Sequence, residues 1–207
     1  MQAESPFPAD TANRILDAAG SVFAERGLAV ATTLAIATRA HVSKHTLYKL
    51  FGNKTGLLLA LILRRAELMK APLLLAGAPR SKDELAAALR LFGTTFLPLI
   101  CAPNVVRVMR LAIADAERAP ELARQMQAHG REPVGRAMQS LLQSAADNGV
   151  IPPGHVAVMV ETYFGVLQGG VSMPLLLGLR SVPRRKEIAE RASLATRAAL
   201  AVAMMEP

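Results

Sequence analysis

The 207-residue chain contains no tryptophan and a single cysteine, and aromatic residues make up only 4% of it. One cysteine, Cys101, cannot form an internal disulfide and cannot hold a metal ion alone, so a disulfide scaffold is excluded and a reducing cytoplasm is expected. The scarcity of aromatic residues also disfavours a β-sandwich. The abundance of Ala and Leu favours packed helices instead.

Catalytic and cofactor motifs are also missing from the sequence. It contains no G-x-S-x-G, H-E-x-x-H or G-x-G-x-x-G motif and no phosphate-binding loop, and its four histidines (41, 45, 129 and 155) are scattered. We therefore expect no enzyme, no cofactor and no metal site. The alternative, an all-helical enzyme without a recognisable motif, is not supported by any residue in the sequence.

Two long uncharged runs could be taken for membrane spans. Residues 91–106 are short and contain two prolines, and residues 162–179 contain Gln168, Pro174 and four glycines. Both runs are better explained as helices buried inside a folded domain. The first residues lack a basic segment followed by an apolar core, so no signal peptide is predicted.

Apolar residues recur at helical spacing along most of the chain, which predicts an all-α fold of about nine helices. Residues 1–10 are expected to be a disordered tail. Serine, threonine or asparagine caps and breaks at glycine or proline predict the helix boundaries. The expected helices cover 11–26, 33–40, 44–50, 54–71, 82–96, 104–116, 120–147, 153–178 and 184–204.

Acidic residues are absent from Arg26 to Arg65, although this segment contains seven lysines and arginines. The whole chain has a formal net charge of +8 and a sequence pI of about 10.4. An excess of positive charge is expected either in a protein that binds a polyanion or in one that only needs to be soluble. Because the acid-free positive charge lies in one segment, binding to a polyanion is favoured.

The stretch VSKHTLYKLFGNK, residues 42–54, combines an apolar face with a basic one. Two short helices joined by a turn at residues 41–43, after a longer helix, are typical of a helix-turn-helix, whose second helix enters the major groove of DNA. Lys44, His45 and Thr46 are then candidates for base edges. Thr33, Tyr48 and Lys49 suit phosphates, and so does Lys54 at a helix N-terminus. The alternative is an ordinary solvated helix, which does not explain the acid-free segment.

Residues 14–62 resemble the DNA-binding domain of TetR-type transcriptional regulators. The matching pieces are ILDAA…VFAERG, the IA..A.VS turn, TLYKLF and the NK before the next helix. The resemblance implies a DNA-binding domain over 11–53 and a helical ligand-binding and dimerisation domain over 54–207. It also adds Ser43 to the DNA-contacting residues. His41 stands where the turn usually has glycine, and Thr55-Gly56 is expected to loosen the start of the next helix.

Residues 110–126 (RLAIADAERAPELARQM) resemble the C-terminal domain of AefR-like members. The resemblance implies a homodimeric, ligand-responsive regulator, with repression the expected outcome, that binds a palindromic operator in double-stranded DNA. A small hydrophobic effector is expected, although core packing alone also explains most of its candidate lining residues. These are Phe92, Phe96, Met109, Ile113, Met126, Tyr163 and Gln168.

The last two long helices are the candidates for the dimer interface, because each has a strip of small residues that permits close approach of another helix. A monomeric core is the alternative. The expected interface residues are Gly165, Gly169, Gly170, Ala195 and Ala199. A second hypothesis for the whole chain is a basic helical protein that binds nucleic acid or a membrane surface without sequence preference.

Overall fold

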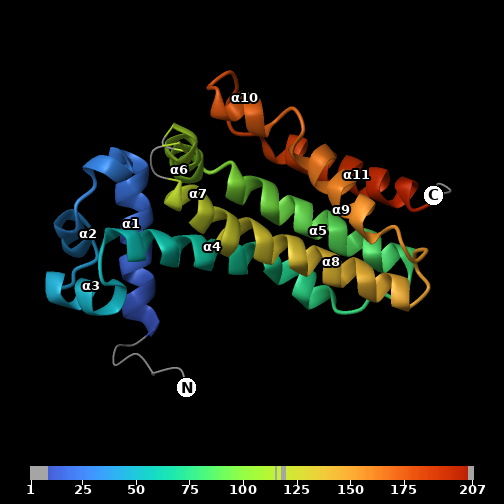
Figure 1. The fold of residues 1–207 in the computed structure, drawn as a ribbon, viewed down its shortest axis with the longest axis horizontal. Helices are drawn as coiled ribbons and strands as arrows, with labels where there is room; N and C mark the ends of the chain where they lie inside the picture. Colours follow the sequence, from blue (N-terminus) through green and yellow to red (C-terminus); the bar gives the residue numbers. More distant parts are fainter. Residues whose placement is uncertain (1–8, 115, 118–119, 205–207) are drawn as a thin grey trace.

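Helices form the whole of the regular structure in the computed structural model, which describes residues 9–114, 116–117 and 120–204 (Figure 1). The expected all-α fold is therefore confirmed. The helices are α1 (Ala9–Val30), α2 (Thr33–Arg39), α3 (Lys44–Phe51), α4 (Lys54–Ala76), α5 (Lys82–Ile100), α6 (Pro103–Ala114), α7 (Glu121–Met126), η1 (Gln127–Arg131, a π-helix), α8 (Glu132–Asp147), α9 (Val156–Gln168), α10 (Ser172–Leu176) and α11 (Arg185–Val202).

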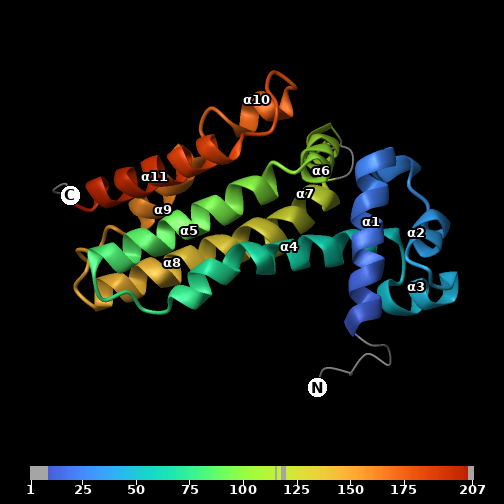
Figure 2. The ribbon, with the colours of Figure 1, turned by 180° about the vertical axis from the view of Figure 1, so that it is seen from behind.

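The three N-terminal helices and the start of α4 enclose a small hydrophobic core at one end of the molecule (Figures 1 and 2). Ile15, Ile36, Leu47 and Leu57, one from each of these helices, are all fully buried in it. Burial of such side chains stabilises each by about 1.5–3 kcal/mol, which is what holds three short helices in one arrangement. The first turn of α4 thus belongs to this unit.

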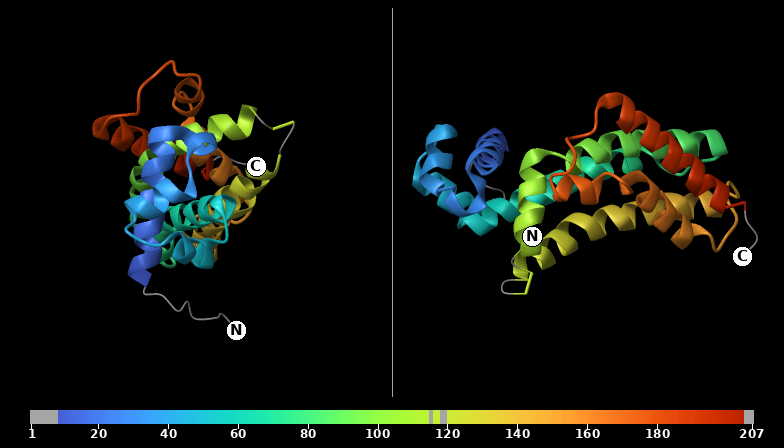
Figure 3. Two further views of the ribbon diagram at one scale, coloured as in Figure 1. Left: turned by 90° about the vertical axis from the view of Figure 1, so that its left-hand side faces the viewer. Right: turned by 90° about the horizontal axis from the view of Figure 1, so that it is seen from above.

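A second, larger core lies between α4, α5, α8, α9 and α11. In Figure 3 these helices form an elongated bundle, with α4 leading into it from the N-terminal unit. α11 packs on both α9 and α5, and α4 packs on α5 and α8. α4 is therefore the one long helix that takes part in both cores among the described residues.

Two helices run past their expected ends and continue through a proline, and only Pro72 was expected to stop its helix. α4 extends through Pro72 to Ala76, and α5 extends through Pro98 to Ile100. Proline removes one backbone donor and usually breaks a helix. Pro72 is buried next to Leu73, a residue of the larger core, so packing maintains the helix here despite the lost hydrogen bond.

One of the two long helices that were expected near the C-terminus is interrupted. The predicted helix 120–147 runs without a gap from Glu121 to Asp147, with a π-helical turn at Gln127–Arg131, whereas the predicted helix 153–178 ends at Gln168 and resumes as α10. At the N-terminus, α1 already includes Ala9 and Asp10, so the expected tail is too long by two residues and its remainder lies outside the described residues. The predicted stop at Gly27 is a kink (φ 78°, ψ 160°) within α1.

The second uncharged run is only partly buried, which differs from the expectation. Tyr163, Leu167, Val171 and Leu175 are buried, whereas Met173, Leu177 and Leu179 are 64%, 65% and 76% exposed. Within the described residues, no individual helix combines the length and the apolar character that crossing a membrane requires. α5 and α6 meet that requirement only when joined, and they meet at 67°.

Cys101 ends α5 and is 1% exposed. Burial raises the pKa of its thiol to about 11. The thiol therefore stays protonated at pH 8, and the thiolate is the form that reacts. We expect iodoacetamide to leave the native protein unmodified at pH 8 and to alkylate it once guanidinium unfolds the chain. Rapid alkylation of the native protein, measured by mass spectrometry, would show that α5 opens at this end.

Candidate nucleic-acid interface and effector domain

The turn between α2 and α3 determines the direction of α3 relative to α2. His41 adopts φ 52°, the left-handed conformation that its sequence position requires. The amide of Val42 donates to the Ala37 carbonyl at 3.0 Å and that of His41 to the Thr38 carbonyl at 3.2 Å. These two bonds form a Schellman motif, which ends α2 and directs the chain into α3. The structure thus accommodates histidine where glycine is usual.

α3 is anchored by one face and exposed on the other. Ser43 caps it, because its Oγ accepts from the amide of Thr46 at 2.9 Å. Leu47 is fully buried, and Leu50 and Phe51 pack beside it in the smaller core. The remaining turns of α3 therefore present their polar side chains outward.

We call the outward side chains of α2 and α3 the recognition face (Thr33, Lys44, His45, Thr46, Tyr48 and Lys49). The hydroxyls of Thr33 and Tyr48 hydrogen-bond at 3.1 Å, and the ammonium of Lys44 lies 5.7 Å from the centre of the Tyr48 ring. Lys44, His45, Tyr48 and Lys49 are exposed, whereas Thr33 and Thr46 are half-buried. The structure thus brings together six of the eight predicted DNA-contacting residues.

The other two predicted residues serve the backbone in this structure. Ser43 is occupied with its cap and with the Thr46 hydroxyl at 2.8 Å. The ammonium of Lys54 donates to the carbonyls of Leu28 at 2.8 Å and Ala31 at 3.4 Å. Lys54 thereby ties the start of α4 to the end of α1 and to the link between α1 and α2.

Two flanking arginines are neutralised by acids that lie outside the acid-free segment of the sequence. Arg39 pairs with Glu25 at 2.6 Å, and Arg64 pairs with Asp17 at 2.8 Å. The hydrogen bond from Arg39 lowers the pKa of Glu25. Sequence reasoning counted both arginines toward the positive field and missed these partners, which only the packing of α1 on α2 and α4 brings close.

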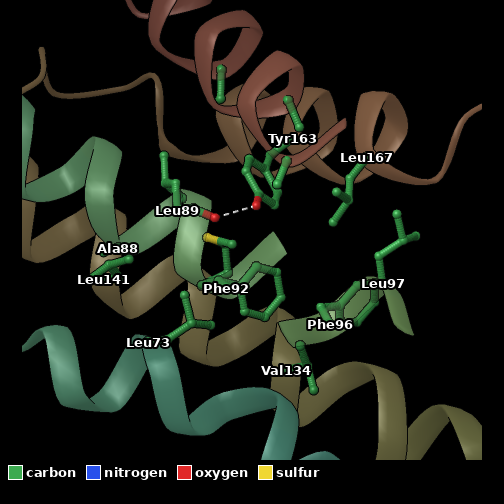
Figure 4. Packing of buried hydrophobic residues seen from close by; sticks show 14 of the residues in the cluster. Leu73, Ala88, Leu89, Phe92, Phe96, Leu97, Val134, Leu141, Tyr163 and Leu167 are labelled. Atoms are coloured by element: carbon green, nitrogen blue, oxygen red, sulfur yellow. Dashed lines mark hydrogen bonds between the residues drawn. The ribbon is translucent and has the colours of Figure 1, made fainter. Parts of the chain in front are cut away.

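Three of the seven predicted effector-lining residues lie in the larger core. Figure 4 shows Phe92, Phe96 and Tyr163 packed together, with Phe92 and Tyr163 fully buried. Ring centroids of Phe92 lie 5.1 Å from Phe96 and 5.8 Å from Tyr163. The Tyr163 hydroxyl donates to the Leu89 carbonyl at 2.6 Å, and burial raises the pKa of this phenol. Side chains fill the space between these rings.

The remaining four candidates do not join this aromatic cluster. Met109, Met126 and Gln168 are half-buried on α6, α7 and α9, and Ile113 is 61% exposed on α6. Beside them on α7, the side-chain oxygen of Gln125 is buried without a hydrogen-bond partner among the described residues. The predicted lining residues are therefore not gathered around one site in this structure.

The expected dimer residues also separate. Gly165 is exposed on α9, whereas Gly169 and Gly170 follow the end of that helix and lie in a turn. Ala195 and Ala199 are 0% and 1% exposed, and they face the core of their own chain, so their assignment to the interface is wrong. The outward side of α11 carries Ala189, Leu194 and Arg197.

The alanine side of α11 faces inward, where small residues of α5 and α11 meet. A Cβ placed on Gly93 of α5 would lie 2.8 Å from the Cβ of Ala192 and 2.6 Å from the Tyr163 hydroxyl. Such distances are shorter than packed carbon atoms allow, so α5 and α11 approach each other closely only because these residues are small. The small residues of α11 thus serve contact within the chain.

Family models match most of the chain. Residues 15–61 match the model described as bacterial regulatory proteins, tetR family, and residues 87–202 match the C-terminal domain of AefR-like transcriptional repressors. The chain is 27% identical over 191 residues to the uncharacterised HTH-type transcriptional regulator YvkB of Bacillus subtilis (strain 168), covering 89% of this chain and 94% of that one.

Solved structures share the fold. A tetR-family regulator from Mesorhizobium loti aligns with a TM-score of 0.75 at 23% identity, over 95% of this chain and 98% of its own. The flavonoid-responsive regulator FrrA aligns with a TM-score of 0.65 at 25% identity, over 95% and 96%. These similarities cover both the helix-turn-helix unit and the helical bundle.

Proposed function

Because this chain belongs to the TetR family and is a DNA-binding transcriptional regulator, we propose that the recognition face is its operator-reading surface. The observation that carries the proposal is the connection of Thr33, Tyr48 and Lys44 across α2 and α3 in a segment without acids. A preformed polar surface loses less side-chain entropy on binding than separate flexible chains.

We divide the roles on this face by position. Lys44, His45 and Thr46 occupy the first turn of α3, the part of a recognition helix that reaches base edges in the major groove. Thr33, Tyr48 and Lys49 lie farther along the face or on α2, where they suit phosphate oxygens. The first turn of α4, with Lys54 and the backbone amides of a helix N-terminus, provides one more phosphate site.

We also propose two functional units within the chain. Residues 11–53, closed by the first turn of α4, bind DNA, and residues 54–207 form the dimer and accept an effector. Gly165 on α9 and the outward side of α11 form the dimer surface, replacing Ala195 and Ala199. In a two-fold dimer each recognition face reads one half of a palindromic operator. Such a regulator acts in the cytoplasm, where bacterial DNA lies, and requires no catalysis.

A small apolar effector fits the composition of the bundle. FrrA, with a similar fold, is by its name responsive to flavonoids. The aromatic cluster of Phe92, Phe96 and Tyr163 offers π-faces to such a ligand. Since side chains fill the cluster, binding would have to move helices apart. Through α4, that movement would change the position of the recognition face. Effector binding would then weaken DNA binding, and DNA binding would weaken effector binding by the same factor.

Salt titrations of DNA binding test the phosphate contacts. Replacing Lys49 with alanine removes one positive charge per subunit, so binding to every duplex weakens, and the slope of log K against log salt falls by about 0.9 for each phosphate that is no longer neutralised. Lys54→Ala is the matched comparison, and the proposed phosphate site at Lys54 predicts a similar decrease of the slope. If Lys54 only holds the carbonyls of Leu28 and Ala31, this variant lowers the melting temperature and leaves the slope unchanged. An unchanged slope for Lys49→Ala would remove that lysine from the phosphate contacts.

A further inference from the structure

The connection between the recognition helix and the connecting helix is a single tight turn. Gly52 adopts φ 71° and ψ −60°, and the amide of Asn53 donates to the carbonyl of Phe51 at 2.7 Å. These values describe a γ-turn with positive φ at its central residue, a rare and strained conformation. A residue with a Cβ adopts this region at considerable cost, so the turn depends on glycine at position 52.

A second glycine, Gly56, is needed for the same turn because it has no side chain where the carbonyl of Phe51 lies. A Cβ placed on Gly56 would lie 1.9 Å from the carbonyl oxygen of Phe51 and 3.1 Å from its carbonyl carbon. The carbonyl that accepts the γ-turn hydrogen bond therefore occupies the space where the side chain of residue 56 would begin. Any side chain there must displace the backbone at the end of α3.

The first turn of α4 is itself firmly held, so α3 is the part that would move. The side-chain oxygen of Asn53 accepts from the amide of Gly56 at 2.9 Å, and Lys54 holds the carbonyl of Leu28 at 2.8 Å. Leu57, in the same turn, is fully buried. These contacts contradict the expectation that Thr55-Gly56 loosens this helix start. They make the turn a rigid joint.

We propose that Gly52 and Gly56 act together as positioning residues, which set the angle between α3 and α4 and thereby the presentation of the recognition face to DNA. The inference rests on the proposed operator-reading role of that face. A side chain at either position rotates α3 on its core contacts. Base contacts require accurate placement of the first turn, whereas charge attraction to phosphates tolerates a small rotation.

The test compares Gly52→Ala, Gly56→Ala and the double variant on two duplexes of equal length, one selected by the wild-type protein and one of random sequence. We expect each single variant to bind the selected duplex about tenfold more weakly or worse, and the random duplex within about twofold of wild type. Gly135→Ala is the control, because a Cβ on that helical glycine of α8 has nothing within 4 Å. It should leave both affinities unchanged.

The double variant separates a joint role from two independent defects. Once Gly52→Ala has opened the γ-turn, the Phe51 carbonyl no longer blocks residue 56, so the double variant should be little weaker than Gly52→Ala alone. If a variant melts too low for binding studies, the same non-additivity is read from melting temperatures at the same pH and salt.

Two outcomes would overturn the inference: single variants that bind the selected duplex as wild type does, or effects that add in the double variant. A wild-type protein that selects no duplex would instead refute the operator-reading role itself. The two failures are therefore distinguishable.

Discussion

Replacing Lys44 with alanine is expected to weaken binding to the preferred operator by about 1–3 kcal/mol per half-site, the usual contribution of one good base contact. The reason is its place in the first turn of α3, where its side chain is exposed and its ammonium lies over the Tyr48 ring. A dimer contains the residue twice, so the loss on a full palindrome is about doubled. Fluorescence anisotropy on operators that differ at single base pairs measures it.

The pattern of losses matters more than their size. When a residue that contacts bases is removed, the protein no longer distinguishes the base pairs at one or two positions of the operator. The variant therefore tolerates base changes at those positions. His45→Ala should relax a neighbouring position in the same way. Equal losses on all duplexes, as expected for Lys49→Ala, would assign Lys44 to the phosphates.

The Phe92→Ala variant is expected to unfold about 3–5 kcal/mol more easily than wild type, because it removes a fully buried ring and leaves a cavity. Phe92 contacts Phe96, Tyr163 and Phe164, with Phe164 meeting it edge-on at 5.7 Å. Its loss would therefore loosen the contact of α5 with α9. Denaturant unfolding followed by circular dichroism measures the change.

Leu91→Ala is the matched control for that experiment, since Leu91 is the preceding residue of α5 and is 54% exposed. Its effect should stay within about 0.5 kcal/mol, as for most surface substitutions. A Phe92→Ala variant as stable as this control would mean that the aromatic cluster is loosely packed. The cluster would then be a preformed cavity for an effector.

The recognition face could be predicted from the sequence because short-range rules govern it. Caps at Ser43 and Asn53 mark helix starts, and the spacing of Leu47, Leu50 and Phe51 marks the buried side. The positive φ at His41 agrees with its place in the resembled turn, where glycine is usual. Each of these signals involves residues within a few positions of one another.

Packing between distant segments could not be predicted in the same way. Pro72 is buried inside α4, and Ala195 is buried on α11, the helix whose Ala192 meets Gly93 of α5. Both facts depend on which helices become neighbours, and periodicity does not reveal that. The turn at Gly52 was missed for a different reason, since a lone glycine after a helix usually indicates only its end.

The most direct test of the central claim is selection of bound duplexes from a random DNA pool at near-physiological salt. A dimeric TetR-family regulator with the recognition face described here should enrich one palindrome, with half-sites spaced for successive major grooves. Strong binding that enriches no sequence would contradict the account, because the basic N-terminal unit would then be a non-specific anchor for nucleic acid.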